Sequence, residues 1–418
     1  MEKIEPKKLR AVNSKTMVVA LDIGKETNTG YCRCPDRSEV KSFVFRNNRC
    51  GFDKLWECVV RTQQAKGLEQ VVVGYESTGC YAEPLLHFLK DKGVRLVQVN
   101  PLHTKRLKEL QGNSPAKTDH KDPKVIADII ELGHGLTVII PEGAAAELRR
   151  LSQARERSIR RRTALFNQLQ DLVFISFPEF LQVMGDIKSK SAQYLLHHYP
   201  APQDLLAQGL EALSAALRRV SRGKFGPMRA RALYEAAQRS VGIREGRTSI
   251  ALEIRETLCA IRACDDLIGL LEHEMSRHLD DIPYSGLILS MKGIGKITAA
   301  GLIGEVGDFR KFHRAQELLK HAGLDLFEIS SGKHKGVKRI SKRGRSQLRR
   351  LLFFAALNTV RKGGIMHEPY QRHLQKGMKR IKALVAIARK LLCVLFALVR
   401  EQCAYCADYR EERQLQAA

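Results

Sequence analysis

The sequence predicts an α/β domain at the N-terminus, then a long helical linker, then a mainly α-helical C-terminal domain. Three observations favour this fold class. Short apolar runs alternate with helical stretches in residues 1–142, strand patterns are missing from residues 143–281, and glycine-rich turns separate the helices of residues 282–418. A chain of 418 residues is long enough for two or three folding units. We therefore expect domain boundaries near residues 142 and 281.

Three short strands are predicted first. Met17–Ile23 is an apolar run that suits a buried strand, and Thr29–Cys34 and Val40–Phe45 are shorter runs on either side of a Pro-Asp-Arg-Ser turn. Strands joined by so short a turn pair antiparallel. The first three strands are therefore expected to form a meander.

Helices and strands then alternate. The predicted elements are a helix over Phe52–Ala65, a strand over Val71–Tyr75, a helix over Tyr81–Lys92, a strand over Val94–Val99 and a helix over Asp119–Leu132. The basic segment Pro101–Lys117 has few apolar residues and is interpreted as a mobile loop. Three antiparallel strands followed by helix, strand, helix, strand and helix is the order of an RNase H-like (RuvC-like) domain.

Acidic residues stand where these elements begin or end. Asp22 closes the first strand and Glu76 the fourth, while Asp119 and Asp122 open the last helix. The first and fourth strands are neighbours in an RNase H-like sheet, and two residues at i and i+3 share one face of a helix. We expect the four carboxylates to converge.

Converging carboxylates repel one another unless cations neutralise them. Mg²⁺ prefers oxygen ligands and keeps positions open for phosphate oxygens. The sequence therefore predicts two Mg²⁺ ions, about 4 Å apart, that clamp the attacking and leaving oxygens of a phosphodiester displacement. The structural alternative is that Asp22 lies in a turn, Glu76 accepts loop amides, and Asp119 or Asp122 caps a helix.

The charge balance indicates a polyanionic partner. There are 71 Lys and Arg against 45 Asp and Glu, a net charge of +26. Neutralised phosphates release counterions, so we expect nucleic acid, with an anionic membrane or a ribosomal-type role as alternatives. Met1–Arg10 is charged and has no apolar h-region, so no secretory signal is expected. Arg389 and Lys390 interrupt the apolar stretch Ala383–Val399, so that stretch is expected to be a packed helix and not a membrane span.

The cysteines favour a reducing compartment. Ten are scattered through the chain, and neither Cys32-x-Cys34 nor Cys403-x-x-Cys406 has a well-spaced partner pair for zinc. We expect free thiols in a cytoplasmic protein; the further expectation of a bacterial, nucleoid-associated location rests on the family resemblance described below.

The linker, residues 143–281, is predicted to form long antiparallel coiled-coil helices. Leucines at helical spacing form an apolar stripe, which favours self-association into a homodimer or homotetramer. Arginines are dense near the start of the linker. We expect phosphate contacts from Arg155, Arg161 and Arg162. The alternative is an arginine face that is merely solvated.

A glycine hairpin begins the C-terminal domain. Lys292, Gly293, Gly295 and Lys296 lie between two apolar helical stretches. Backbone N–H groups exposed at such a helix start receive phosphate well. The pattern is typical of a helix-hairpin-helix that binds the DNA backbone without reading its sequence.

A Ser-Ser-Gly turn at residues 330–332 precedes a strongly basic run. The cations expected to contact phosphate are Lys333, Lys338, Arg339, Lys342, Arg343, Arg345 and Arg349. Serine is a poor nucleophile unless a base, a cation or a metal-activated phosphate assists it. Taken alone, such a turn is more often a loop that satisfies its own backbone.

Several motifs together resemble a known family. In the first domain they are Leu21–Gly24, Tyr75–Tyr81, Val99–Pro101 and Lys117–Asp122; later in the chain they are Leu148–Leu151, Gly293–Gly295, Ala322–Asp325, Ser331–Gly332 and Ile340–Gly344. Over nearly the whole chain the sequence resembles the DEDD-type insertion-sequence transposases, which pair a RuvC-like domain with a C-terminal serine domain and include the Piv-type DNA invertases. It departs from them at Leu326, where proline is common, and at Pro123, where a small residue is commoner.

The resemblance implies a transposase or site-specific recombinase. Asp22, Glu76, Asp119 and Asp122 would hold Mg²⁺, and Ser331, with Ser330 as the fallback, would form a covalent phosphoserine with DNA. It also implies donor and target DNA as partners and a noncoding guide (bridge) RNA. The rival functions are a junction-resolvase type of nuclease that hydrolyses DNA with water, and a non-catalytic nucleic-acid scaffold.

Overall fold

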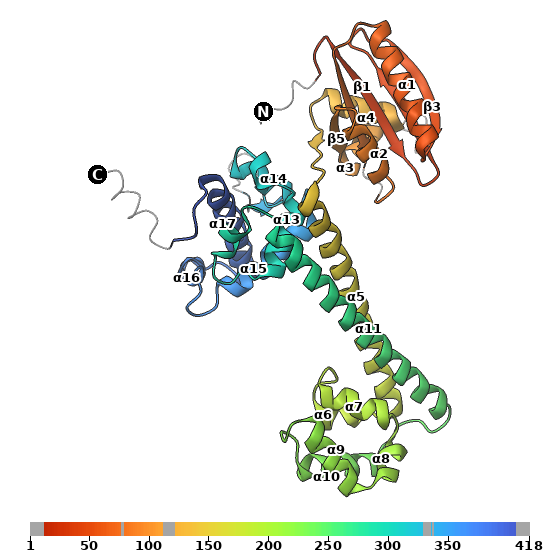
Figure 1. The fold of residues 1–418 in the computed structure, drawn as a ribbon, viewed down its shortest axis with the longest axis vertical. Helices are drawn as coiled ribbons and strands as arrows, with labels where there is room; N and C mark the ends of the chain where they lie inside the picture. Colours follow the sequence, from red (N-terminus) through yellow and green to blue (C-terminus); the bar gives the residue numbers. More distant parts are fainter. Residues whose placement is uncertain (1–11, 77–78, 112–121, 329–335, 337, 407–418) are drawn as a thin grey trace, which may run out of the picture. The chain divides into compact units, whose positions relative to one another are not determined.

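The computed structural model describes residues 12–76, 79–111, 122–328, 336 and 338–406. They form two compact units, which consist of Met1–Pro141 with Arg310–Lys320, and of Glu142–Phe309 with His321–Ala418 (Figure 1). Residues 143–281 and most of 282–418 belong to the same unit, and the three-domain division stays a prediction.

A mixed β-sheet forms the centre of the first unit. Within the described residues its strands are β1 (Thr16–Ile23), β2 (Thr27–Arg33), β3 (Glu39–Arg46), β4 (Gln70–Glu76), β5 (Arg95–Val99) and β6 (Leu136–Thr137), in the order β3-β2-β1-β4-β5-β6. The first three are antiparallel, which confirms the predicted meander. The central strands β1, β4 and β5 are parallel, and the short β6, which was not predicted, closes the edge antiparallel to β5.

Alternate residues of β1 face opposite layers of helices, because strand side chains have a period of two. Met17, Val19 and Leu21 pack with α1 (Arg49–Ala65) and α2 (Glu83–Lys90). Val18 and Ala20 pack with α4 (Asp122–Glu131) on the other face. Figure 1 shows the sheet with helices against it. This mixed sheet with helices on both faces fits an RNase H-like fold.

The segment after β5 is helical, so the prediction of a loop over Pro101–Lys117 is wrong for its first part. Pro101–Gln111 forms helix α3. The side chain of Asn100 accepts a hydrogen bond from the backbone N–H of Leu102 at 2.9 Å, and proline occupies the first helical position. The helix has few apolar residues, and its N-terminal cap and its packing against α4 help to hold it in place.

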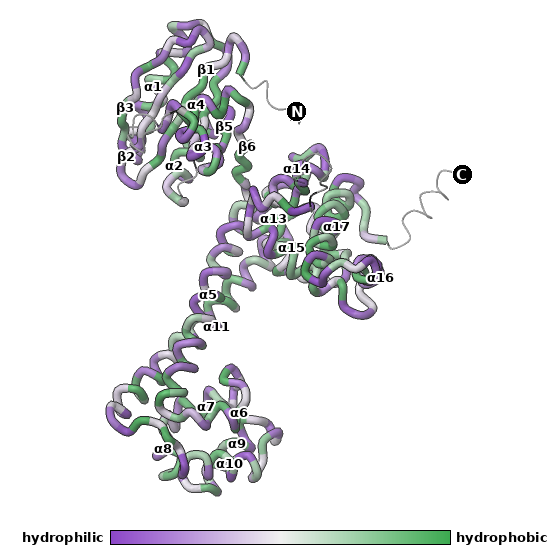
Figure 2. The backbone as a smooth tube through the Cα atoms, turned by 180° about the vertical axis from the view of Figure 1, so that it is seen from behind, coloured by the Kyte–Doolittle hydropathy of each residue, from purple (hydrophilic) through white to green (hydrophobic). Residues whose placement is uncertain are grey.

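Two long helices run antiparallel in the second unit. They are α5 (Gly143–Ser176) and α11 (Arg247–Asp280). Arg155 pairs with Glu272 and Arg162 with Asp265, so residue numbers rise along α5 as they fall along α11. Figure 2 shows hydrophobic and hydrophilic residues alternating along both helices, as expected for two amphipathic helices in contact.

Short helices fill the connection between α5 and α11. They are α6 (Phe180–Met184), α7 (Lys190–His198), α8 (Pro202–Gln208), α9 (Leu210–Val220) and α10 (Pro227–Gln238). Their apolar residues share one core with the end of α5 and the start of α11, including Phe177, Phe180 and Ile254.

The C-terminal part of the chain is mainly helical. Its elements are α12 (Ser285–Leu289), α13 (Lys296–Val306), the 3-10 turn η1 (Phe309–Lys311), α14 (Ala315–His321), the strands β7 (Leu326–Phe327) and β8 (Arg339–Ile340), α15 (Ser346–Thr359), α16 (His367–Gln375) and α17 (Arg380–Glu401). No helix among the described residues is both long and apolar enough to cross a membrane.

Glycines let α13 lie directly on α5. A Cβ atom at Gly304 would stand 2.6 Å from the backbone nitrogen of Arg149, and one at Gly301 would meet Ser152 and Leu351. Such close backbone approach is a usual role of glycine inside a helix. It brings Glu305, the residue after Gly304, beside α5.

Candidate active site

Asp22 and Glu76 lie at adjacent strand ends. In the parallel pairing of β1 with β4, Leu21 is opposite Tyr75, so the next residue of each strand is an acid. By strand alternation Asp22 shares a face with Val18 and Ala20, the face that α4 covers. The structure therefore turns both acids toward the side of the sheet where α4 begins.

Asp122 is the first residue of α4 and is buried, with an exposed fraction of 8%. Its carboxylate oxygen lies 2.6 Å from the Nζ atom of Lys108, which α3 supplies. The other acid of the predicted helical pair, Asp119, lies outside the described residues.

The pKa of Glu76 shows that the three acids sense one another. Burial raises the pKa of Glu76 above its usual value, and the negative charges of Asp22 and Asp122 raise it further. A hydrogen bond with Thr104 and the positive charge of Lys108 act in the opposite direction. A cation bound between these carboxylates would act in the same direction as Lys108 and favour the ionised form of Glu76.

The donor set suits a hard divalent cation. Asp22, Glu76 and Asp122 offer only carboxylate oxygens, the ligands that Mg²⁺ prefers. The raised pKa of Glu76, to which the charges of Asp22 and Asp122 contribute, is of the kind that a bound cation reverses. Within the described part of the chain, however, no three acidic, histidine or cysteine side chains are already arranged around a common metal position.

Two residues of this site were missed by the sequence reasoning. Thr104, only 2% exposed, and Lys108 both come from α3, the helix interpreted as a loop. The sequence held a signal, because Asn100 followed by Pro101 is a common helix start.

The linker arginines divide into two groups. Arg155 and Arg162 bind Glu272 and Asp265 of α11, at 2.6 and 2.5 Å. Arg161 is exposed. The first two link α5 to α11 in this structure, and phosphate contact by all three stays a prediction.

The glycine hairpin joins α12 to α13 and presents its polar residues to solvent. Lys292, Gly293, Gly295 and Lys296 are exposed, whereas Ile294 between them is buried and anchors the turn. Gly293 has a φ of +99°, and a Cβ atom there would lie 2.9 Å from the Thr359 side chain. Glycine is therefore required at this position, while the helix-hairpin-helix assignment stays a prediction.

The serine segment lies between β7 and β8 in the chain. These two strands pair antiparallel, Leu326 with Ile340 and Phe327 with Arg339. Ser330, Ser331 and Lys333 lie outside the described residues. The exposed cations of the basic run that follows are Lys338, Arg339, Lys342 and Arg343.

Two cations of the basic run hold the fold together. Arg345 donates to the Glu305 carboxylate at 2.7 Å. Arg349 donates to the carbonyl oxygens of Ala322 and Gly344, at 2.8 and 3.1 Å. Both side chains are partly buried, and their contact with phosphate stays a prediction.

Two family models match the chain. One, described as a transposase of the DEDD type from IS110 elements, matches residues 19–178, and the other, described as transposase IS116/IS110/IS902 family, matches residues 285–371. The first covers the sheet with its acids and the start of the long helix, and the second covers the glycine hairpin and the serine segment. Together they define the class: a DEDD transposase.

Similar proteins span nearly the same length. The 43.6 kDa protein of insertion element IS110 from Streptomyces coelicolor is 26% identical, over 93% of this chain and 95% of its own. The transposase for insertion sequence element IS1111A from Coxiella burnetii is 24% identical, over 85% and 87%. The pilin gene-inverting protein of Moraxella bovis is 30% identical over a shorter stretch, 34% and 46%. The chain belongs to the IS110 family of transposases.

Proposed function

We propose that the chain cleaves and exchanges DNA strands as the transposase or site-specific recombinase of an insertion sequence. Asp22, Glu76, Asp119 and Asp122 form the acidic centre, and Ser331 is the nucleophile. The observation that carries the proposal is the pair of acids at the ends of β1 and β4: burial, and then the charges of Asp22 and Asp122, raise the pKa of Glu76. The pilin gene-inverting relative supports recombination as the outcome.

The acids have a clear use in phosphoryl transfer. Bound Mg²⁺ would stabilise the charge that develops on the phosphate oxygens. The carboxylates would hold it at the ends of two adjacent parallel strands, which are rigid elements with buried neighbours. Lys108, next to Asp122, adds a positive charge on the same side of the sheet.

The serine step replaces one phosphate ester bond with another. The Ser331 oxygen attacks phosphorus and loses its proton, while the bond from phosphorus to one deoxyribose oxygen breaks and that oxygen leaves as a hydroxyl. A second hydroxyl later attacks the phosphoserine and releases the serine. The number of phosphate ester bonds is unchanged, so rejoining needs no nucleotide hydrolysis.

The partners follow from charge and from family. A net charge of +26 suits a protein that holds long polyanions. We propose donor and target DNA as substrates, a noncoding guide RNA as an additional partner, and a homodimer or homotetramer as the working form. The antiparallel α5–α11 pair offers long helices for such assembly.

The serine is tested by trapping the covalent intermediate. Full-length protein is incubated with Mg²⁺, the flanking RNA of its element and end-labelled donor and target DNA, and a protein–DNA adduct is sought after denaturation. Ser331→Ala is expected to abolish the adduct, and Ser330→Ala is the matched control. Cleavage that survives Ser331→Ala without an adduct would identify a water-using nuclease instead.

The acidic centre is tested separately. Asp22→Asn and Glu76→Gln are expected to abolish cleavage while DNA binding persists, because the carboxylates hold the cation and not the phosphate backbone. Glu57→Gln, an exposed acid on α1, is the control. Full strand exchange by both active-site variants, or in the presence of EDTA, would show that the acids are structural.

A further inference from the structure

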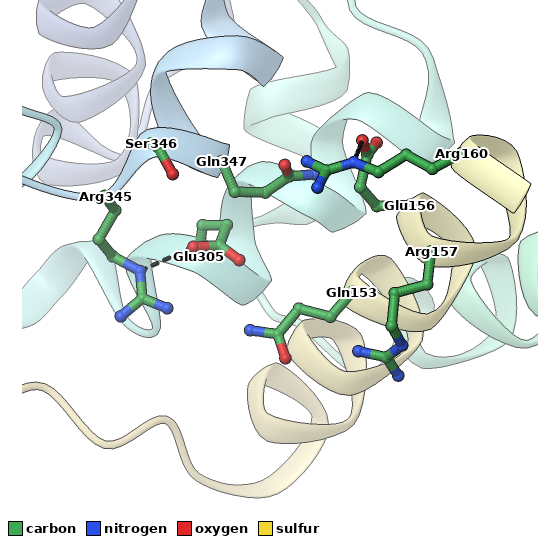
Figure 3. A pocket seen from close by; sticks show the side chains of 8 residues that line it. All are labelled: Gln153, Glu156, Arg157, Arg160, Glu305, Arg345, Ser346 and Gln347. Atoms are coloured by element: carbon green, nitrogen blue, oxygen red, sulfur yellow. Dashed lines mark hydrogen bonds and ion pairs between the residues drawn. The ribbon is translucent and has the colours of Figure 1, made fainter. Parts of the chain in front are cut away.

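A pocket in the second unit contains a buried acid with an unused acceptor. It lies where α5, α13 and the start of α15 meet, and its volume is about 350 Å³. Figure 3 shows Gln153 and Arg157 of α5, Glu305 of α13 and Gln347 of α15 among the side chains around it. This volume falls within the range of about 300–1,000 Å³ that is typical of small-ligand sites.

Glu305 is the unusual group in this pocket. Only 3% of the residue is exposed, and Arg345 holds one carboxylate oxygen at 2.7 Å. The other oxygen, Oε1, is buried and accepts no hydrogen bond from any described residue. A buried polar atom without a partner costs free energy of the order of 1–3 kcal/mol, so a site that keeps one is suited to a ligand that donates a hydrogen bond.

The remainder of the pocket favours an anion. Arg157 is exposed and binds no carboxylate within the described residues, whereas Arg160 already pairs with Glu156 at 2.9 Å. Helix α15 is 14 residues long and begins at Ser346 without a side-chain cap, so its first backbone N–H groups are available to an acceptor. A ligand that uses both features has to carry a negative group and, at a separate position, a hydrogen-bond donor.

A nucleotide has this combination. We propose that the pocket binds one unpaired nucleotide of a nucleic-acid strand whose base carries an exocyclic amino group, with the amino group donating to Glu305 Oε1 and the phosphate lying near Arg157 and the first turn of α15. Glu and Asp accept hydrogen bonds from the amino group of cytosine in nucleic-acid complexes. Gln153 and Gln347 offer amides to the other polar atoms of the base.

The inference goes beyond strand exchange, because it concerns binding alone and needs neither the acids of the first unit nor Ser331. DNA and RNA carry the same amino groups, and the strand that supplies the nucleotide is decided by experiment.

The test compares pyrimidines that carry different hydrogen-bonding groups at positions 3 and 4 of the ring. Fluorescently labelled decamers of dC and dT, and of rC and rU, are titrated with the full-length protein, and affinity is measured by anisotropy. Cytosine has an exocyclic amino group and an N3 acceptor where thymine and uracil have a carbonyl oxygen and an N3–H donor, so only cytosine places an exocyclic donor at position 4. We expect about tenfold tighter binding of the cytosine strand, the size of one good base contact. A preference found with only one sugar also supports the proposal and identifies the strand as DNA or RNA.

Variants assign the preference to the pocket. Glu305→Gln is expected to remove or reverse the cytosine preference, because the amide can donate to the carbonyl oxygen. Arg157→Ala should weaken binding of both strands and leave their ratio unchanged. Arg231→Ala removes an equal charge from an exposed position on α10 and should also leave the ratio unchanged.

Glu305→Gln removes the charge that pairs with Arg345 and could affect folding, so a second variant is needed. Glu305→Asp keeps the charge and withdraws the carboxylate by one methylene group, and thermal unfolding checks that each variant is folded. The proposal is overturned if the wild type binds cytosine and thymine or uracil strands equally. It is also overturned if the folded Glu305 variants keep the wild-type ratio.

Discussion

Glu76 illustrates how one buried carboxylate is set by its neighbours. Its strand places it beside Asp22, α4 brings Asp122, and α3 adds Thr104 and Lys108. Burial and like charge outweigh the hydrogen bond and the ammonium group, so the pKa is raised. In the folded protein without divalent ions, the ionised form of Glu76 therefore lowers the free energy of unfolding.

Glu76→Gln should stabilise the metal-free protein at neutral pH. Because the pKa of Glu76 is raised in the folded protein, its contribution to the free energy of unfolding is greatest at pH values below its usual pKa. That contribution is lost as the pH rises through the raised pKa. We expect the variant to gain about 2 °C in Tm at pH 7.5 in EDTA and nothing at pH 4. Thermal unfolding at both pH values measures this, with Glu57→Gln as the control. An equal gain at both pH values would contradict the prediction.

Lys108 competes with a cation for Asp122. Its Nζ atom lies 2.6 Å from the carboxylate, and Lys108→Met keeps the aliphatic length while removing the charge. We expect Mn²⁺ and Mg²⁺ to bind about fivefold more tightly to the variant, which corresponds to about 1 kcal/mol of lost competition. Calorimetric titration measures the affinity, and Lys105→Met on the exposed side of α3 is the control. Weaker binding would instead show that Lys108 orients Asp122 for the metal.

At the scale of elements, α3 depends on its cap more than on its composition. Asn100 accepts the N–H of Leu102, and the helix then carries Thr104 and Lys108 to the acids. A cap of this kind contributes about 1 kcal/mol. The position of two site residues thus rests on one local hydrogen bond and on packing against α4.

Asn100→Ala should therefore disturb the site as well as the helix. We expect a loss of about 1 kcal/mol of stability, faster hydrogen exchange in α3 and weaker Mn²⁺ binding. Asn48→Ala is a matched control, because Asn48 caps α1 by accepting from the Gly51 N–H at 3.0 Å. It should cost similar stability and leave Mn²⁺ affinity unchanged. Equal effects of both variants on Mn²⁺ affinity would refute a specific role of α3.

Variants in the α5–α11 pair can show whether a linker arginine binds DNA or an acid of the neighbouring helix. Arg162 and Asp265 are partly exposed, so their ion pair contributes less than about 1 kcal/mol. We expect Arg162→Glu to lower both stability and DNA affinity slightly, and the double variant with Asp265→Arg, which has the wild-type net charge, to restore both. Urea unfolding and DNA titration are the measurements. A loss of DNA affinity that persists in the stable double variant would assign Arg162 a phosphate contact.

At the scale of the whole molecule, charge is the dominant feature. A surplus of 26 positive charges is spread over both units, and many exposed Lys and Arg lie outside the ion pairs. Such a surface binds nucleic acid mainly through the release of counterions. Base recognition, including that proposed for Glu305, adds to this background.

DNA affinity should accordingly fall steeply with salt. Between 50 and 200 mM salt we expect a loss of about 10³-fold or more, as for proteins that neutralise about six to ten phosphates. The slope of log affinity against log salt is the measurement, taken with duplex DNA of unrelated sequence. A slope near zero would exclude the phosphate backbone as the main contact. Arg157→Ala should reduce the slope by about one.

Much of the first unit could be predicted from local patterns. Apolar runs predict the strands β1 to β5, and the acids Asp22 and Glu76 stand out because each lies at the end of such a run. A strand pattern depends on side chains two residues apart, so it is legible without any knowledge of distant neighbours. Helix α3 was misread because its sequence lacks an apolar stripe and its cap was taken for a loop.

The sequence by itself determined the class of protein, the order of elements and the acids at the strand ends, because these depend on residue type and short-range spacing. Only the tertiary structure decided the partners: Lys108 for Asp122, Asp265 for Arg162 and Arg345 for Glu305. The physical reason is range. Hydrogen bonds and close ion pairs act over about 3–4 Å, so their choice follows from positions that distant packing sets, as where Gly304 lets α13 lie on α5.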